Sequence, residues 1–552
     1  MKLQLMNKII AQISKSILLF TLLVFTNSCD DPTEGLNVII DTNNVYDATL
    51  TVQFVNANPQ ITDAPENVET SFKGDDASNV IDLAGTKDFN IDNGFVGLGV
   101  ISTDDISEEN PLSFTIIADA PGYATTIKQV TISNPEEEGG FLVVEMLDKN
   151  NPPEGVNIVT AQISINPSTG ATVGDFILLN DATNGKTERA SLNIPAGTIF
   201  YDENAQIING ISQLTVDFIH FDDQSEASLF SFPGGFIAEN VVDTDGSPLE
   251  PVQFTTAGLI ELEISTSTQK VKQFSQPVKI GIELNENTLN PDTDYNAVSE
   301  NDTIPVWKLE HGSEDTWSLE GESIVTKNDE TGKLEANFEI THLCYYNWDW
   351  GWRSSWTWNP TCNFRTNISS NIDANAYSTN WYYIELINNS NNRVITRRWS
   401  SLRNTSNLYF WYIRRNTNVK LRVWETGPWW NRGNLIKESE VFNSCNIGQL
   451  DVQLALPEPI TIDLSARCSG SEDLIIRPST SILFKPANSS YWRYLGYLKS
   501  GKLVSYNSEL KVGETYKFAA WYGGQWNMQD ITLESKTNTF EVVLPEDYCS
   551  GF

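Results

Sequence analysis

The chain has 552 residues, of which 72 are acidic and 36 are basic, and its formal net charge is −36 at pH 7. An excess of negative charge this large repels nucleic acid and excludes nucleic-acid binding for most of the chain. The length predicts roughly three to five domains. Charge is spread unevenly along it: residues 30–348 hold 54 acidic and 12 basic side chains, whereas residues 349–457 hold 7 acidic and 12 basic side chains.

The first thirty residues have the pattern of an export signal. Three lysines, Lys2, Lys8 and Lys15, precede an apolar run from Ile17 to Phe25. Nine apolar residues are too few to cross about 30 Å of hydrocarbon as a helix. A run of this length is instead typical of a signal peptide that is cleaved after export.

This segment resembles the signal of Bacteroidetes surface lipoproteins. Small polar residues precede Cys29, although Thr26 stands where that family usually has leucine, and two aspartates follow the cysteine. The resemblance implies that residues 1–28 are removed, that Cys29 carries the acyl chains, and that residues 29–35 form a tether. Two or more acyl chains make a stable anchor. We therefore expect a lipid-anchored protein of the outer membrane, exposed on the cell surface.

The remainder of the chain has the pattern of β-strands. Alternating runs such as Ala48–Val55 and Ile127–Ile132 recur between clusters of Asn, Gly, Pro and Asp, and helical periodicity is almost absent. The sequence therefore predicts an all-β chain with several β-sandwich modules in tandem. The first module is expected over residues 36–150, and its stretch Ala120–Ala124 resembles the regulatory-like, transthyretin-type β-sandwiches of bacterial surface proteins.

A second β region is expected over residues 156–348. Its runs Leu192–Phe200, Gln213–Phe218 and Phe254–Ile264 are similar in order and spacing to the ZU-type β-module of ankyrins. They are closer still to its relatives in cartilage intermediate layer protein and astroprincin. Those relatives act in adhesion and scaffolding, and the resemblance implies no catalytic residue. The resemblance therefore supports an expectation about the fold more than one about the function.

The last two modules, residues 349–456 and 460–552, are interpreted as a diverged repeat. Lys420–Trp424 matches Lys517–Trp521 in sequence, and a glycine and a further tryptophan follow each segment at identical offsets. Within Lys420–Trp424, Leu421 is expected to face the core, which would turn Trp424 outward. The same reasoning predicts an outward Trp521.

Cysteines bracket the two copies. Beyond Cys29, the chain holds Cys344, Cys362, Cys445, Cys468 and Cys549. Beyond the inner membrane, cysteines can oxidise. We expect one disulfide from Cys362 to Cys445 and another from Cys468 to Cys549, which would leave Cys344 as the odd thiol. The main alternative is a short loop closed by Cys344 and Cys362.

Local motifs for catalysis or metal binding are missing from the sequence. The three histidines, His220, His311 and His342, share no metal-ligand spacing, and no nucleophile elbow or phosphate-binding loop is found. Asp243–Gly246 resembles part of a calcium loop but lacks further ligands, so an Asp-Gly hairpin turn explains it better. We therefore expect no enzymatic activity, no cofactor and no metal site. Calcium is compatible with so acidic a surface but has no complete motif.

Tryptophan is the residue type whose distribution along the chain points most directly to a binding function. All sixteen tryptophans lie at or after Trp307. They could pack the joint between the second and third modules, or form exposed rows that bind a partner or stack on sugar rings. The candidates for such binding are Trp348, Trp350, Trp352, Trp356, Trp358, Trp424, Trp429, Trp521 and Trp526.

The third module is also rich in arginine. Six of its arginines could dock either an acidic polysaccharide or the acidic front half of the chain: Arg393, Arg397, Arg398, Arg403, Arg414 and Arg415. The functional expectation is a non-catalytic binding, scaffold or adhesion subunit that docks onto an outer-membrane protein complex. A polysaccharide-binding lipoprotein is the alternative, and a hydrolase with a non-local site is the least favoured reading. In this view the acidic half is a stalk, and the Trp-rich half recognises the partner away from the membrane.

Overall fold

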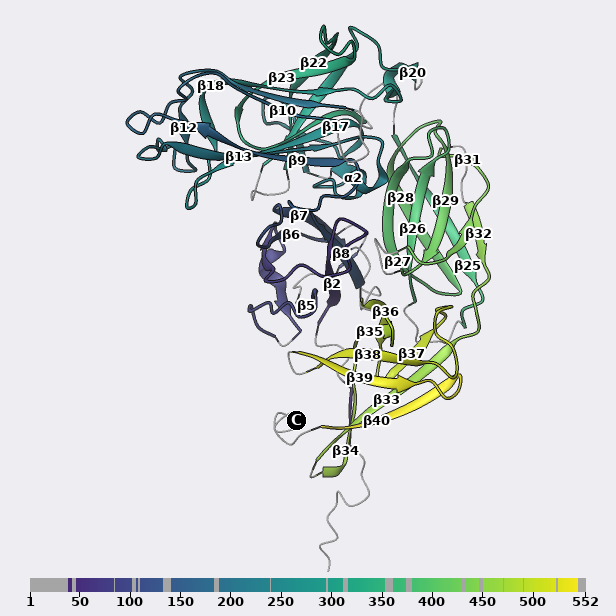
Figure 1. Cartoon of the computed structure of the whole chain (residues 1–552). Helices are drawn as coiled ribbons and strands as arrows, with labels where there is room; N and C mark the ends of the chain where they lie inside the picture. The colour runs from purple at the N-terminus through teal and green to yellow at the C-terminus, as the bar shows by residue number, and fades with distance from the viewer. Residues whose placement is uncertain are drawn as a thin grey trace, which may run out of the picture. The chain divides into compact units, whose positions relative to one another are not determined.

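The structure, a computed structural model, is all-β, as the sequence predicts (Figure 1). It describes residues 38–41, 46–83, 85–101, 106–107, 110–132, 140–182, 188–238, 240–293, 296–310, 316–352, 361–373, 380–427, 432–445, 450–469, 471–489, 491–522 and 525–544. Among these, α2 (Glu226–Phe230) is the one α-helix, and η1 (Ala77–Asn79) and η2 (Pro291–Thr293) are single 3₁₀ turns. No helix in these ranges is long and apolar enough to cross a membrane.

The chain forms two compact units. The smaller unit takes its described residues from positions 1–42, 464–478 and 540–552, and the larger unit from positions 43–463 and 479–539. Three β-modules and most of a fourth belong to the larger unit.

The first module is a β-sandwich. One sheet has the order β4-β5-β2-β8 and the other the order β3-β6-β7. Its strands are β2 (Ala48–Asn56), β3 (Glu69–Lys73), β4 (Val80–Asp82), β5 (Phe95–Val100), β6 (Leu112–Asp119), β7 (Thr126–Ile132) and β8 (Gly140–Met146). Alternate side chains of β2 and β6 meet between the sheets, where Val52, Phe54 and Phe114 are at most 1% exposed. All nine residues of β2 are buried, so its outer face is covered as well.

The second module is one large sheet with the path β10-β11-β18-β23-β22-β21-β24-β17-β13-β9 and short branches. Its strands are β9 (Val156–Ser164), β10 (Phe176–Asn180), β11 (Ala190–Ile194), β12 (Phe200–Tyr201), β13 (Gln213–Phe221), β14 (Ile237–Ala238), β15 (Asn240–Val242), β16 (Pro248–Leu249), β17 (Val252–Ser265), β18 (Gln273–Glu283), β21 (Thr303–Leu309), β22 (Thr316–Lys327), β23 (Leu334–His342) and β24 (Tyr345–Trp352). A separate pair is formed by β19 (Leu289–Asn290) and β20 (Asn296–Ala297). β24 pairs with β21 from Tyr345 to Trp348 and with β17 as far as Trp352. The predicted boundary at residue 348 therefore cuts through a central strand and is wrong.

The third module is a sandwich of two sheets, with orders β28-β25-β32 and β27-β26-β29-β30. Its strands are β25 (Thr361–Ser370), β26 (Asn380–Asn388), β27 (Val394–Leu402), β28 (Thr405–Arg414), β29 (Asn418–Glu425), β30 (Leu435–Glu438), β31 (Phe442–Asn443) and β32 (Leu450–Leu454). Leu421 and Val423 of β29 face its core, as the alternation predicts. A disulfide joins Cys362 to Cys445, the pairing expected from their positions, with 5.9 Å between the Cα atoms.

The fourth module contains the sheet β36-β35-β38-β39 in the larger unit. Its strands are β33 (Ile460–Cys468), β34 (Ser471–Arg477), β35 (Thr480–Pro486), β36 (Arg493–Leu498), β37 (Lys502–Ser505), β38 (Thr515–Tyr522), β39 (Gln525–Thr532) and β40 (Thr537–Leu544). The first four residues of β33 pair with β37 in the larger unit, and its last residues pair with β34 in the smaller unit.

The smaller unit includes an unexpected strand from the start of the chain. β1 (Val38–Asp41) runs parallel to β34, with Val38 opposite Leu474 and Asp41 opposite Arg477. The sequence predicts these residues in the first module, which is wrong for β1. The expected stalk, with the Trp-rich half held away from the membrane, stays a prediction.

Candidate functional site

The tryptophan run of β24 packs inside the second module. Trp348 is 0% exposed and Trp350 is 2% exposed. Both belong to the main hydrophobic core of this module, while Tyr345 on the opposite face of β24 belongs to a second buried cluster. A central strand that is buried on both faces presents no ring to solvent. Trp348 and Trp350 therefore do not form the exposed binding row. They are packed, but in the core of the second module and not in a joint between the second and third modules.

The other residues of this run are not placed. The side chain of Trp352 and all of Trp356 and Trp358 lie outside the described residues, as does Trp429.

Trp521 lies on the predicted outer face of β38, but it is not exposed there. Trp521 and Trp526 are 4% and 7% exposed, and their rings lie 5.4 Å apart edge to face. Trp526 also packs against Phe95 of the first module, at 5.8 Å between ring centroids. The face of β38 that alternation turns away from its own core is covered by another module, which strand periodicity alone cannot reveal.

Trp424 is the tryptophan of the repeat that lines a groove. This groove, called here the arginine groove, has a volume of about 1020 Å³ and lies within the larger unit. Its walls come from β7 and β8, from α2 and the loop after it, and from β26, β27 and β29. Trp399, Tyr409 and Trp424 are half-buried in its lining, together with Phe236.

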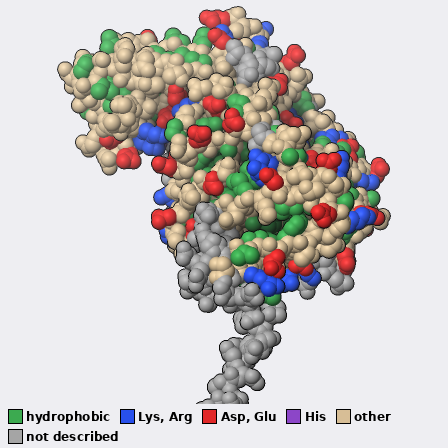
Figure 2. All heavy atoms as spheres, turned by 60° about the horizontal axis from the view of Figure 1, so that its bottom comes forward, with side chains coloured by type: hydrophobic (Ala, Val, Ile, Leu, Met, Phe, Trp, Pro, Cys, Tyr) green, Lys and Arg blue, Asp and Glu red, His purple; other side chains and the backbone are tan. Residues whose placement is uncertain are grey.

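The lining of the arginine groove is strongly cationic. One acidic side chain, Glu226, is part of it, against six basic side chains: Lys128, Arg393, Arg397, Arg398, Arg422 and Arg432. Three of these, Arg393, Arg397 and Arg398, belong to the arginine-rich stretch that the sequence already shows in the third module. Alternation along Lys420–Trp424 also puts Arg422 on the same face as Trp424. Sequence reasoning missed Lys128 and Arg432, because they come from a separate strand and loop that only the tertiary fold brings together. On the face in Figure 2, acidic and basic side chains are interspersed, so the uneven charge of the sequence does not divide that face into two regions.

Buried carboxylates hold several of these cations. Glu145 of β8 accepts ion pairs from Lys128, at 3.3 Å, and from Arg397, at 3.1 Å. Burial alone would raise the pKa of Glu145, but the two cations outweigh burial and hold the pKa below its ordinary value. Arg393 forms an equivalent pair with Asp223, at 3.1 Å.

Arg432 is held between acidic and aromatic groups. Its guanidinium pairs with Glu385 and Glu226, and it lies over the rings of Phe230, at 5.2 Å, and Trp424, at 5.3 Å. The Trp424 indole N–H donates to Glu385 at 2.9 Å. Burial raises the pKa of Glu385 despite the nearby Arg432. These contacts fix the position of the Trp424 ring in the groove wall.

The arginine pairs also answer a question left open by the sequence. Arg393 and Arg432 of the third module pair with Asp223 and Glu226 of the second module, and Arg397 pairs with Glu145 of the first. The basic module thus docks onto the acidic front half of the same chain. This use of the arginines does not exclude a ligand, since their guanidinium groups also line the groove.

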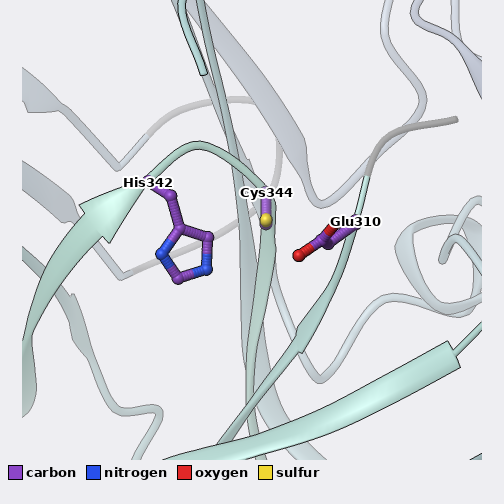
Figure 3. Close-up of side chains that lie close together, drawn as sticks. All are labelled: Glu310, His342 and Cys344. Carbon is purple, nitrogen blue, oxygen red and sulfur yellow. The ribbon is translucent and has the colours of Figure 1, made fainter. Parts of the chain in front are cut away.

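A second cluster of polar side chains lies at the end of β21. Glu310, His342 and Cys344 point toward one another, with their ligand atoms all within 4.8 Å (Figure 3). The sequence hides this cluster because Glu310 is far from the other two residues in the chain. It forms because β24, which starts just after Cys344, pairs with β21, whose last residue precedes Glu310.

The chemistry of this cluster does not favour a metal ion. The ammonium of Lys308 lies 3.0 Å from His342 Nε2 and 3.4 Å from Glu310 Oε1, so a cation already neutralises the site. Burial and Lys308 lower the pKa of His342, and burial raises the pKa of the Cys344 thiol. A protonated thiol is a poor metal ligand. Cys344 is a free buried cysteine, as the predicted pairing requires.

The remaining sequence predictions have mixed outcomes. Asp243–Gly246 forms the turn between β15 and β16, with the Gly246 amide donating to the Asp243 carbonyl at 2.8 Å. Gly246 has φ +79°, which glycine adopts readily. The predicted partner of Cys468, Cys549, and the lipidation site Cys29 lie outside the described residues.

Comparison with known proteins supplies no family. No protein-family model matches the chain, and no curated protein matches it. Among solved structures, the shaft pilin spaA from Lactobacillus rhamnosus GG is 9% identical and covers 33% of this chain and 97% of its own, with a TM-score of 0.17. The Bacillus anthracis TIE protein is 9% identical over 67% of this chain and 74% of its own, with a TM-score of 0.14. BcpA, the major pilin subunit of Bacillus cereus, is 11% identical over 74% of this chain and 98% of its own, with a TM-score of 0.13. Scores this low carry no argument about function.

Proposed function

We propose that this protein is a non-catalytic scaffold or adhesion subunit of the outer-membrane surface. It is anchored by acyl chains on Cys29 and docks onto an outer-membrane protein complex. The observation that supports this role most is a single aromatic cluster in which three modules meet. A body whose modules are packed together can hold binding surfaces at fixed positions, which is the physical requirement of a scaffold.

The cluster, called here the aromatic joint, is built from buried side chains of three modules. Phe95 and Phe141 come from the first module, Trp381 from the third, and Tyr494 and Trp526 from the fourth. The rings of Phe141 and Tyr494 are stacked at 4.5 Å, with 10° between their planes. Domains joined by small polar interfaces normally move relative to one another, whereas an apolar joint of large rings resists such motion.

Ion pairs reinforce the aromatic joint. Arg397 joins the first and third modules through Glu145, a carboxylate that is 7% exposed. Arg393 joins the second and third modules through Asp223, which is 1% exposed. Removing one member of a buried pair leaves an uncompensated charge, which costs about 3–5 kcal/mol. The charge asymmetry of the sequence is therefore used for assembly within the chain.

The test is capture of the lipidated protein from the outer membrane. Chemical crosslinking on intact cells, solubilisation of the outer membrane and affinity capture should recover a stoichiometric protein partner. Protease added to intact cells should digest the protein, as expected for a surface location. Recovery of the free monomer alone, or protection from protease on intact cells, would contradict the proposal.

A lipidation variant separates the anchor from docking. Cys29→Ala should abolish incorporation of labelled fatty acid and release the protein from the membrane fraction. The purified soluble variant should still bind its partner in solubilised membranes, because the modules are unchanged. Persistent membrane association of Cys29→Ala without fatty acid would show that the anchor is not Cys29.

A further inference from the structure

We propose that the arginine groove binds an acidic oligosaccharide, with sugar rings against Trp399, Tyr409 and Trp424 and acidic substituents against the guanidinium groups. The inference rests on the proposed surface role, because a surface protein meets such polymers, and it names a ligand class for that role. It is carried by three features of the groove: the sign of its charge, the placement of its rings and its size.

The charge of the lining is opposite to that of the protein. Six basic and one acidic side chain line the groove, in a chain whose net charge is −36. In the pairs that Arg393 and Arg397 form, the cation is the more exposed member. Arg393 and Arg397 are 20% and 22% exposed, whereas their partners Asp223 and Glu145 are 1% and 7% exposed. A cleft lined by one sign of charge focuses the field and attracts ligands of the opposite sign.

Arg432 repeats this arrangement at the other wall. Its side chain is 20% exposed and its partner Glu385 is 0% exposed, whereas its second partner, Glu226, is 51% exposed and is itself part of the lining. Carboxylates behind the wall thus position the guanidinium groups, and the groups themselves lie at the surface of the groove. Guanidinium is the side chain best suited to planar, two-point recognition of carboxylate.

The aromatic rings are held rigidly beside these cations. Trp399 packs edge to face on Phe141 at 5.3 Å and lies 5.0 Å from Tyr383. Trp424 is fixed by its hydrogen bond to Glu385. Rings that are already immobilised lose little entropy when a ligand stacks on them. Tryptophan, tyrosine and arginine together are also the residues that contribute most of the binding energy at recognition sites.

The size of the groove suits several linked sugar rings. Its volume of about 1020 Å³ lies at the upper end of the range of roughly 300–1,000 Å³ for ligand clefts. The lining holds aromatic rings and guanidinium groups together, which suits a chain of sugar rings that each carry an acid group. An acidic polypeptide shares the charge but not the rings, so polyglutamate is the appropriate competing probe.

The experiment is calorimetric titration of the full-length mature protein with oligogalacturonate and with heparin oligosaccharides. At least one of these should bind, and affinity should fall steeply as salt is raised. The fully methyl-esterified oligogalacturonate has the same sugar rings but no charge. If the groove recognises the acid groups, the ester should bind at least tenfold more weakly than the free acid. Failure of both acidic probes to bind, or equal binding by the ester and its acid, would overturn the proposal. Binding of polyglutamate in their place would do so as well.

Variants tie the binding to the groove. Arg422 lines the groove and pairs with Glu438, a half-exposed carboxylate, so Arg422→Gln should leave the fold intact. We expect it to weaken oligosaccharide binding several-fold, whereas Arg415→Gln, an exposed arginine outside the lining, should have no effect. Trp424→Phe, which keeps a ring but shrinks it, should also weaken binding. Unchanged affinity in Arg422→Gln would contradict the site.

The same variants separate this inference from the proposed scaffold role. Capture of a protein partner by Arg422→Gln, together with loss of oligosaccharide binding, would support both. If the parent protein captures the partner but binds no acidic oligosaccharide, the scaffold role stands and the proposed ligand is wrong.

Discussion

At the scale of single residues, the fold tolerates ionisable groups in places where they cost stability. Glu261 of β17 is 2% exposed and lies between β13 and β24. Asp349 of β24 is 0% exposed, and burial raises its pKa well above the ordinary value. Its partner is the Asn347 amide, which donates to it at 2.8 Å. Neither carboxyl is part of the lining of the arginine groove, and both are interpreted as structural.

Glu261 leads to a prediction about pH. Burial and the nearby Glu263 raise its pKa to about 8, while its value in the unfolded chain is about 4.3. Below the unfolded value both states are protonated and the residue costs nothing. As pH rises toward 8 the unfolded chain releases the proton while the fold retains it, so stability falls by up to a few kcal/mol in all.

Glu261→Gln should remove this dependence. The variant should melt at a higher temperature than the parent at pH 8, and the difference should shrink as pH falls toward 5. Thermal melts across this pH range measure it. Glu339→Gln, at an exposed position of the same module, is the matched control and should change little. A parent and variant that differ equally at pH 5 and pH 8 would show that the carboxyl of Glu261 does not titrate as stated.

At the scale of elements, strand alternation predicted which face of β29 and of β38 turns away from the module's own core, but not what covers that face. Both strands place alternate side chains in their own cores. On β29 the opposite face leaves Trp424 half-buried in a groove, whereas on β38 the opposite face carries Trp521 into the aromatic joint. Alternation reports which residues share a face. It does not report what covers the second face.

β1 leads to a prediction about the smaller unit. It is held by parallel backbone pairing with β34, and proline removes the N–H that such pairing needs. Replacing both Ile39 and Ile40 by proline should therefore detach β1, whichever of the two amides faces β34. The double alanine variant keeps both amides and is the control.

The expected result is local. Residues near β34 should exchange their amide hydrogens faster in the proline variant, while the first module should be unchanged. Hydrogen exchange read by mass spectrometry resolves the two regions. Equal exchange in the proline and alanine variants would show that β1 does not stabilise β34.

At the scale of the larger unit, its modules are joined by buried rings and paired charges. Phe141 of the first module contacts rings of two other modules, Tyr494 of the fourth and Trp399 of the third. The core of the first module lies on the other side of its sheet and does not include Phe141. The joint and the module core can therefore be perturbed separately.

Phe141→Ala should loosen the joint without unfolding the first module. Truncating a buried phenylalanine costs about 3–5 kcal/mol, and here that cost is expected in contacts between modules. Small-angle scattering should show a larger radius of gyration, and proteases should cut between modules more readily.

Phe114→Ala, in the core of the first module, is the matched truncation. It should destabilise that module itself and lower its unfolding temperature. If Phe141→Ala had the same effect and left the scattering unchanged, the aromatic joint would not be what holds the modules together.

The sequence by itself determined the all-β class and the inward face of β29, and it predicted the pairing of Cys362 with Cys445 against an alternative that the structure excludes. These depend on alternation, turn residues and spacing, which are local properties of the chain. Only the tertiary structure decided that Trp348 and Trp350 are buried, that β1 joins β34, and that the arginine groove exists. These features depend on which distant strands pair and which faces pack together, and the same local pattern is compatible with many such arrangements. For Arg393 and Arg397, the sequence shows the basic character of the module, whereas only the fold shows their acidic partners, Asp223 and Glu145.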